Sequence, residues 1–324
     1  MLRYRFGAGA GLLSLALSLP APPAGACSIC RCGDPTFNAL GSNVYASGAF
    51  HLVLDWDHLS KEQGVFDPHG GHGAARLVSR HAGHGETETL VENRVTATLS
   101  YAFAERVNLV ARVPYSFKTL TEGEEVTDTN GFADPDIYAL VRLWSSSFGP
   151  GLGRRTWISA LAGVKTPWGK NALVQDGQRV DEHAQPGTGS ADVFGGLAFL
   201  HLFDERSALF ASGQFRGTGS NDFAYRYGDI TLANVAYERK LTGWLDAVLE
   251  LNYRHAGRDR ADAEGIEDPN TGGSILYLTP RVVVDLGKGL VARVGVQIPT
   301  WKGLNGEQTE KAVVNAGVTY LFSF

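Results

Sequence analysis

Long apolar runs are missing from most of this 324-residue chain. Beyond the first twenty residues, no stretch approaches the roughly 18 unbroken apolar residues of a membrane helix. A basic excess is also missing, since the net charge is −5, and nothing in the composition suggests a nucleic-acid partner. Cysteine is scarce, and all three cysteines lie between positions 27 and 32. Thiol chemistry is therefore confined to one short segment, and a helical membrane protein is excluded.

The first 26 residues have the organisation of a secretory signal peptide. Arg3 and Arg5 make a basic start, residues 12–19 (LLSLALSL) form a short apolar run, and residues 24–26 (AGA) provide a small-residue cleavage site. Cleavage would make Cys27 the first mature residue. It would change the net charge to −7, because it removes two arginines and no acid.

The three cysteines precede the first predicted strand, in a segment (27–43) that we expect in the periplasm. Export favours a disulfide, but an odd number of thiols leaves one over. Cys27 is also open to acylation as a lipoprotein. Cys27, Cys30 and Cys32 together suit a soft metal or thiol exchange, whereas haem attachment needs a histidine where Arg31 stands. Disulfide, lipid anchor and metal or redox site remain alternative hypotheses.

Alternation with a period of two runs through the rest of the chain. In residues 244–256, Leu245, Leu249 and Leu251 share one face and Asp246 and Glu250 the other, as in a strand with an apolar and a polar side. Twelve such segments are predicted, at 44–57, 88–103, 107–118, 135–145, 155–166, 190–203, 207–216, 228–241, 244–256, 274–286, 290–299 and 311–324.

The connections between these segments alternate between short and long, as in a bacterial outer-membrane barrel with short periplasmic turns and long external loops. The sequence therefore predicts an all-β fold, a transmembrane antiparallel up-and-down β-barrel of about 12 strands spanning residues 44–324, in the cell outer membrane. The terminal Phe324 resembles the signal read by the barrel-assembly machinery. A soluble sandwich or lipocalin would also alternate, but would bury its apolar face inside.

Three motifs carry a family resemblance. They are GFADPDIYALVRLW (131–144), GVKTPWGKN (163–171) and QPGTGSADVFGGLAF (185–199). They resemble signatures of the outer-membrane transporter-like barrels named for the meta-pathway of phenol degradation. Ala133 replaces a glycine of that pattern, and Trp168 replaces a small polar residue. The resemblance covers residues 95–324 and implies the barrel fold without specifying a substrate.

Projecting the polar face of each strand inward predicts the residues of the lumen. Twelve strands should leave a passage narrower than that of a 16-stranded porin. The alternative is that the charges pair across the lumen and plug it. The predicted pore-lining residues are Arg94, Arg112, Arg142, Lys165, Arg216, Asp246, Glu250, Arg254, Arg281 and Arg293.

The first long loop is rich in histidine. His69, His72, His81 and His84 form two H-x-x-H pairs among glycines, and neutral imidazoles bind transition metals. With the cysteines, they form a candidate metal set for Cu or Zn, although a solvated loop explains the pattern equally well.

The leading functional hypothesis is a passive or gated outer-membrane channel for a small solute, with membrane lipid and the assembly machinery as partners. The second is a metal- or redox-handling protein that uses Cys27, Cys30, Cys32 and the histidine-rich loop. An enzyme ranks third, because His201, His255, Ser159 and Ser212 occur in no catalytic motif.

Overall fold

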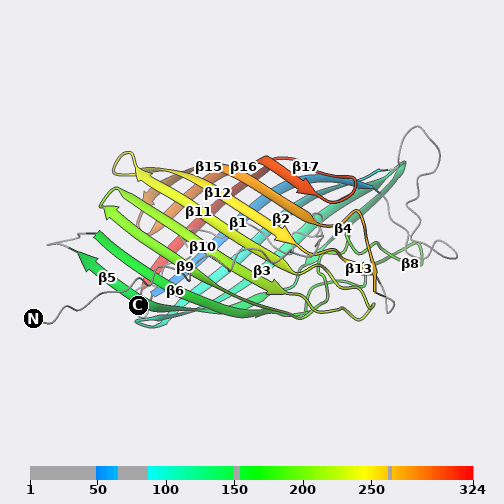
Figure 1. Cartoon of the computed structure of the whole chain (residues 1–324), viewed down its shortest axis with the longest axis horizontal. Helices are drawn as coiled ribbons and strands as arrows, with labels where there is room; N and C mark the ends of the chain where they lie inside the picture. The colour runs from blue at the N-terminus through cyan, green and yellow to red at the C-terminus, as the bar shows by residue number, and fades with distance from the viewer. Residues whose placement is uncertain (1–48, 65–86, 149–153, 262–264, 324) are drawn as a thin grey trace, which may run out of the picture.

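The computed structural model describes residues 49–64, 87–148, 154–261 and 265–323. Within these ranges the chain is an antiparallel sheet closed into a barrel (Figure 1). The strands of its wall are β1 (Ala49–Gly64), β2 (Thr87–Ala104), β3 (Val107–Glu122), β5 (Asp136–Phe148), β6 (Arg154–Lys165), β9 (Asp192–Asp204), β10 (Ser207–Gly217), β11 (Ile230–Lys240), β12 (Leu245–Ala256), β15 (Gly273–Gly287), β16 (Leu290–Leu304) and β18 (Val313–Ser323).

The barrel closes where its first and last strands meet. β1 pairs with β2 on one side and with β18 on the other, from Ala49 opposite Ser323 to His58 opposite Val314. Each wall strand in between pairs with its neighbours, so the described wall has no free edge. The predicted twelve-stranded antiparallel barrel is confirmed.

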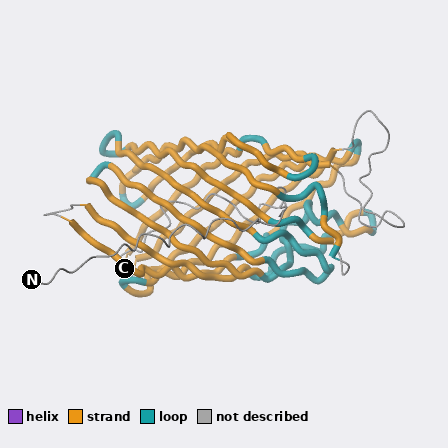
Figure 2. The backbone as a smooth tube through the Cα atoms, viewed as in Figure 1, coloured by secondary structure: helices purple, strands orange, loops and turns teal. Residues whose placement is uncertain are grey.

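Short and long connections lie at opposite ends of the barrel. Turns at 105–106, 205–206, 241–244 and 288–289 stand at one end, on the left of Figure 1. Most of the loop backbone gathers at the other end (Figure 2). No helix in the described ranges is long and apolar enough to cross a membrane.

Six shorter strands lie at the long-loop end. β4 (Glu125–Phe132) pairs with residues 115–122 of β3, while β5 pairs with residues 107–112 of the same strand. β17 (Gln308–Glu310) pairs with the end of β1. Two small hairpins lie within loops and consist of β7 (Val174–Gln175) with β8 (Gln178–Arg179), and β13 (Arg260–Ala261) with β14 (Ile266–Glu267).

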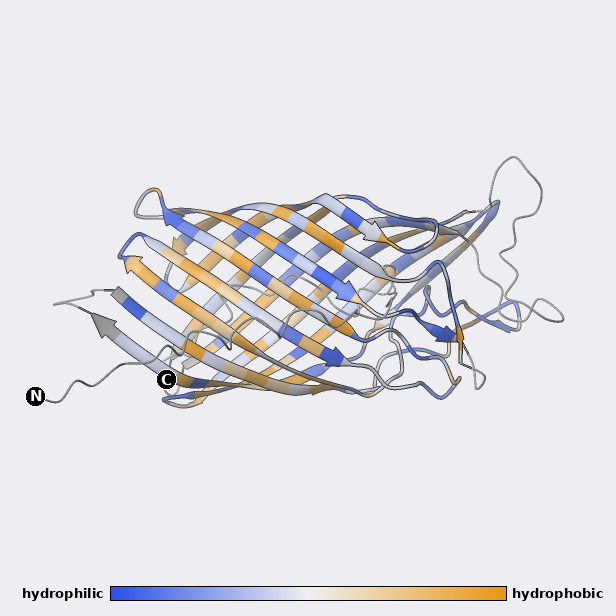
Figure 3. Ribbon diagram, in the orientation of Figure 1, coloured by the Kyte–Doolittle hydropathy of each residue, from blue (hydrophilic) through white to orange (hydrophobic). Residues whose placement is uncertain are grey.

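Hydrophilic and hydrophobic residues alternate along the wall strands (Figure 3), and the exposed fractions place the apolar ones on the outer face. In β11, Leu232 and Asn234 are buried while Val235 and Tyr237 are exposed. Exposed leucines, valines and aromatics recur around the barrel, and a soluble monomer rarely exposes so large an apolar surface. The interior is dominated by buried polar and charged groups. The sandwich and lipocalin alternatives therefore fail, because they would bury the apolar face.

The largest errors in the predicted boundaries lie at the long-loop end. β1 continues past residue 57 to Gly64, where it faces Thr87 of β2. The expected loop at 119–134 contains the end of β3 and all of β4, and β16 continues to Leu304. Beyond the bilayer the outer face need not be apolar, so the alternation fades although the strands continue.

Candidate functional site

Three sequence motifs meet at the carboxylate of Asp134, between β4 and β5. One carboxylate oxygen accepts a hydrogen bond from the backbone N–H of Gly169 at 2.9 Å. The other accepts from the N–H and hydroxyl of Thr188, both at 2.6 Å, and from the N–H of Gly189 at 3.2 Å. The segments that carry the family resemblance therefore form one structure, in which Asp134 fixes the β6–β9 connection (166–191) to the barrel.

The glycines of these motifs allow the close approach. Gly189 has a φ of +66°, and a Cβ there would lie 1.6 Å from the Asn171 side-chain nitrogen. A Cβ on Gly169 would lie 2.7 Å from the backbone of Ala133. Trp168, which departs from the family pattern, is 71% exposed and takes no part in this packing.

Charge pairing continues from Asp134 along the inner wall. The Lys165 ammonium lies 3.5 Å from Asp134 and 2.9 Å from Asp192, and it donates to the Ser190 hydroxyl at 3.0 Å. Lys165 and both carboxylates are nearly fully buried. A buried charge is tolerated when it is paired and hydrogen-bonded, so this cluster rigidifies the wall beneath the loop.

The same network of ion pairs continues to Arg112 of β3. Arg216 lies 3.0 Å from Asp136 and 3.9 Å from Asp192. Arg112 approaches Asp136 at 3.8 Å and keeps 30% of its side-chain surface exposed. It is therefore the most accessible cation of this cluster, which otherwise lies in the wall.

Four connections, here called the mouth loops, fold over the long-loop end. They are residues 166–191, 218–229, 257–272 and 305–312, of which 262–264 lie outside the described ranges. The first three of these loops and the inner faces of β2 and β3 form a small apolar core inside the barrel mouth. Its buried members are Leu90, Leu120, Val180, Ala184, Tyr225, Tyr227 and Ala261.

Lys118 of β3 connects the first mouth loop to the barrel wall. Its buried ammonium donates to the backbone carbonyls of His183 at 2.9 Å and Gln185 at 2.6 Å. The Gln185 side chain in turn bonds the backbone of Leu173 at 3.0 Å and Val180 at 2.8 Å. One wall residue thus holds a loop segment that is ordered by its own side-chain hydrogen bonds.

His183 is the point where three mouth loops and the wall converge. Its buried ring lies 3.1 Å from Asp181, 3.8 Å from Glu88 of β2 and 3.7 Å from Asp259. The Tyr225 hydroxyl is 3.3 Å from the ring and donates to Asp259 at 2.9 Å. Burial raises the pKa of Asp181, but the charge of His183 and its hydrogen bonds outweigh burial, so the net shift is downward.

Glu310 of β17 holds the last mouth loop. Its carboxylate lies 2.7 Å from Arg254 and 3.4 Å from Lys61, and it accepts a hydrogen bond from the Tyr277 hydroxyl. Burial raises the pKa of Glu310, but the two cations and the hydroxyl outweigh it and lower the pKa to about 2.

The remaining predicted pore residues lie on the inner wall or its rim. Arg142 donates to the carbonyl of Glu105 at a short turn, and Asp246 stands near the short-turn end of β12. The others form ion pairs: Arg94 with Glu92, Arg281 with Glu250, and Arg293 with Asp55. Arg254 and Arg293 are both engaged in ion pairs with carboxylates. That these side chains line an open passage stays a prediction.

Neutral polar side chains form a belt between these charges. Asn234 donates to Ser212 at 3.2 Å, Asn252 donates to Asn234 at 3.1 Å, and Thr279 donates to Asn252 at 2.6 Å. These three hydrogen bonds, here called the asparagine ladder, cross β10, β11, β12 and β15 on the inner face. The inner wall is therefore held together by neutral hydrogen bonds as well as by paired charge.

The candidate metal residues lie outside the described residues. This holds for Cys27, Cys30 and Cys32, for His69, His72, His81 and His84, and for Phe324. Within the described ranges, no three His, Cys, Asp or Glu side chains are grouped to hold a metal ion. The Cu or Zn hypothesis and the role of Phe324 stay predictions.

The catalytic candidates are not brought together. His201 contacts Thr156 at 2.8 Å and His255 contacts Ser274 at 2.8 Å. Ser212 belongs instead to the asparagine ladder. Neither histidine is placed beside Ser159 or Ser212, the pairing that nucleophilic catalysis would require.

Sequence reasoning missed the residues that hold the mouth loops, namely Asp134, Lys118, His183 and Glu310. Asp134 was available from the motif, in which an aspartate and a proline precede a strand. Lys118, His183 and Glu310 stand in no sequence motif. Each of them contacts a residue more than 40 positions away in the sequence, so the neighbouring residues give no indication of its role.

No protein-family model matches this chain, and comparison with curated proteins finds no match. Among solved structures, an outer membrane channel from Pseudomonas putida F1 is similar, with a TM-score of 0.60 and 12% identity over 87% of this chain and 98% of that one. The Ralstonia pickettii toluene transporter TbuX gives a TM-score of 0.41 and 13% identity over 86% and 90%. The resemblance to the meta-pathway family stays a resemblance. The closed wall, its apolar exterior and the similarity to the P. putida channel show that the chain is an outer-membrane β-barrel of twelve strands.

Proposed function

We propose that this barrel is a gated channel through which a small solute crosses the outer membrane, with the mouth loops as its gate. The observation that carries the proposal is the way the loops are held. Buried side chains of the wall, above all Lys118, bond to loop backbone inside the mouth. The similar P. putida structure is described as a channel, which supports a transport function.

The inner wall suits a solute that carries polar or anionic groups. Paired charges and the asparagine ladder cover it, and the guanidinium of Arg112 is accessible to a passing solute. Arginine binds carboxylate in a planar, two-pronged geometry. The apolar residues of the mouth, including Leu90 and Tyr227, are buried under the loops and would contact the apolar part of the same molecule when the loops open. We therefore propose a small amphipathic acid as the solute class.

Arg112→Gln tests whether a passage runs past this cation. In planar bilayers the variant should show an anion-to-cation permeability ratio lower by up to roughly fivefold, because a unit charge about 4 Å from an ion is worth about 1 kcal/mol even in water. Arg206→Gln, in an exposed short turn, serves as the matched control and should leave the ratio unchanged. An unchanged ratio in Arg112→Gln would mean that ions do not pass this residue.

A further inference from the structure

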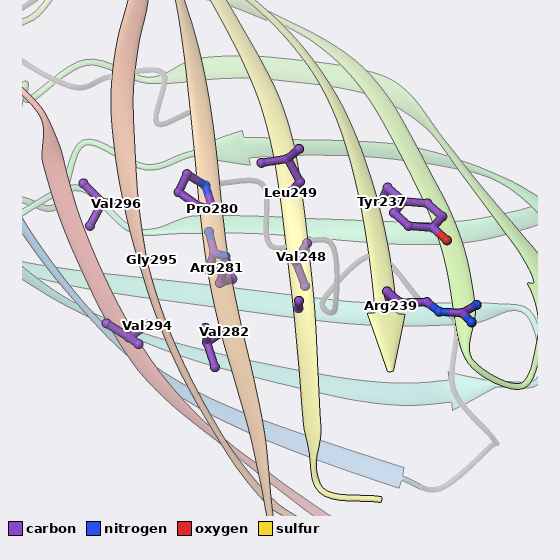
Figure 4. Close-up of a pocket in the computed structure, with 11 residues that line it drawn as sticks. Tyr237, Arg239, Val248, Leu249, Pro280, Arg281, Val282, Val294, Gly295 and Val296 are labelled. Carbon is purple, nitrogen blue, oxygen red and sulfur yellow. The ribbon is translucent and has the colours of Figure 1, made fainter. Parts of the chain in front are cut away.

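The outer wall is hollowed where β11, β12, β15 and β16 run side by side (Figure 4). The hollow has a volume of about 510 Å³ and faces the bilayer. Its walls are mainly apolar, formed by Leu249, Pro280, Val282 and Val294 among others, with Tyr237 and Arg239 on the β11 side. We call it the wall groove.

Small residues and a gap in the strand pairing produce the groove. Ala247 lies between Arg239 and Val282 in the register, so one row across the wall has a small side chain at its centre. The β15–β16 ladder skips Thr279 and Pro280, and proline has no N–H to donate. Gly295 of β16 also lines the groove, but only through its backbone, because its Cβ position faces Asn315 and Arg281 on the inner side.

The charged end of the groove lies toward the short turns. Arg239 is the penultimate residue of β11, directly before the turn that leads to β12. Among the described residues, Arg239 forms an ion pair with Asp204 at 3.7 Å. Both side chains are about half exposed, so the pair is weak and the guanidinium of Arg239 can accept another anion. Tyr237 is exposed one row nearer the membrane centre. Aromatic and basic side chains at this level typically meet lipid headgroups.

We infer that the wall groove is a binding site for one anionic phospholipid of the inner leaflet. One acyl chain lies in the hollow against Leu249, Pro280 and Val282, and the phosphate accepts hydrogen bonds from Arg239. The charge and the direction of the groove select this occupant, because an arginine at the periplasmic level of an apolar furrow complements a headgroup joined to a hydrocarbon chain. The inference does not depend on the proposed transport function.

Native mass spectrometry of the intact barrel, with phosphatidylglycerol added to the detergent solution, tests the site. The wild type should retain one phosphatidylglycerol under conditions that strip other bound lipid. Arg239→Gln should weaken retention about tenfold, as expected for a lost charge-assisted hydrogen bond. Diacylglycerol, which lacks the phosphate, should be retained as weakly by the wild type as phosphatidylglycerol is by Arg239→Gln.

A second variant tests the hollow itself. Ala247→Leu fills the groove from its outer face and should also reduce retention, whereas Ala233→Leu, at an exposed position of β11 outside the groove, should not. Arg206→Gln controls for net charge at the same rim. Heat-modifiable gel mobility would show that each variant is folded. Equal retention by the wild type, Arg239→Gln and Ala247→Leu would identify ordinary annular lipid and overturn the inference, as would equal retention of diacylglycerol.

Discussion

Replacing Asp134 with asparagine should detach the first mouth loop from the barrel while the wall stays closed. The carboxylate accepts three backbone N–H groups and one hydroxyl of this loop and pairs with Lys165. An amide offers one acceptor oxygen and presents an NH₂ group to the remaining donors. Buried groups left unpaired in this way cost about 3 kcal/mol. Local opening should therefore become on the order of a hundredfold more frequent.

Hydrogen exchange followed by mass spectrometry measures this opening directly. Peptides that contain Gly169 and Thr188 should lose protection in Asp134→Asn, while peptides from β10 to β12 keep theirs. Asp176→Asn is the matched control, because Asp176 is an exposed acid in the same loop. Unchanged protection at Gly169 and Thr188 would show that Asp134 does not anchor the loop.

Acidification should release the last mouth loop. Glu310 has its pKa lowered to about 2 by Arg254, Lys61 and Tyr277, from an ordinary value of 4.5. A carboxylate with a depressed pKa contributes stability that is present above its ordinary value and is lost as pH falls toward the folded value. The shift corresponds to about 3 kcal/mol. Asp181, whose pKa is also lowered, adds an effect of the same sign in the first loop.

Lowering the external pH from neutral to about 3 should therefore raise single-channel conductance. Raising the pH to about 9 should cause no increase that depends on Glu310 or Asp181. Glu310→Gln should already conduct more at neutral pH and should respond less to acid. The account of Glu310 fails if the wild type and Glu310→Gln respond to acid identically.

The wall of the barrel was predictable because every strand repeats the same physical requirement. A residue such as Leu249 or Val294 must face lipid, and its neighbours must face the polar interior, so alternation appears in each segment. The short turns, such as 205–206 and 288–289, share one end of the barrel, as the alternation of loop lengths predicted. That this end faces the periplasm stays a prediction. Boundaries failed above the bilayer, where this requirement ends, as at the extension of β1.

The interior was predictable only in part. Alternation placed Arg216 and Arg254 on the polar face, but it cannot tell which acids they meet, because Asp136 and Glu310 are 80 and 56 residues away. The loops that fold back into the mouth follow no period. Their docking depends on single contacts such as Lys118 with the carbonyl of His183, and a lysine on a polar strand face looks the same whether it meets water or a loop.

Single-channel conductance of the wild type and of Lys118→Met in planar bilayers tests the central claim most directly. Methionine keeps the bulk of Lys118 but removes the donors to His183 and Gln185, so the first mouth loop loses its attachment to β3. Lys302→Met, at an exposed position of β16, is the control and should conduct like the wild type. Larger and more frequent openings in Lys118→Met are the predicted result. Identical conductance in all three proteins would contradict a gate formed by the mouth loops.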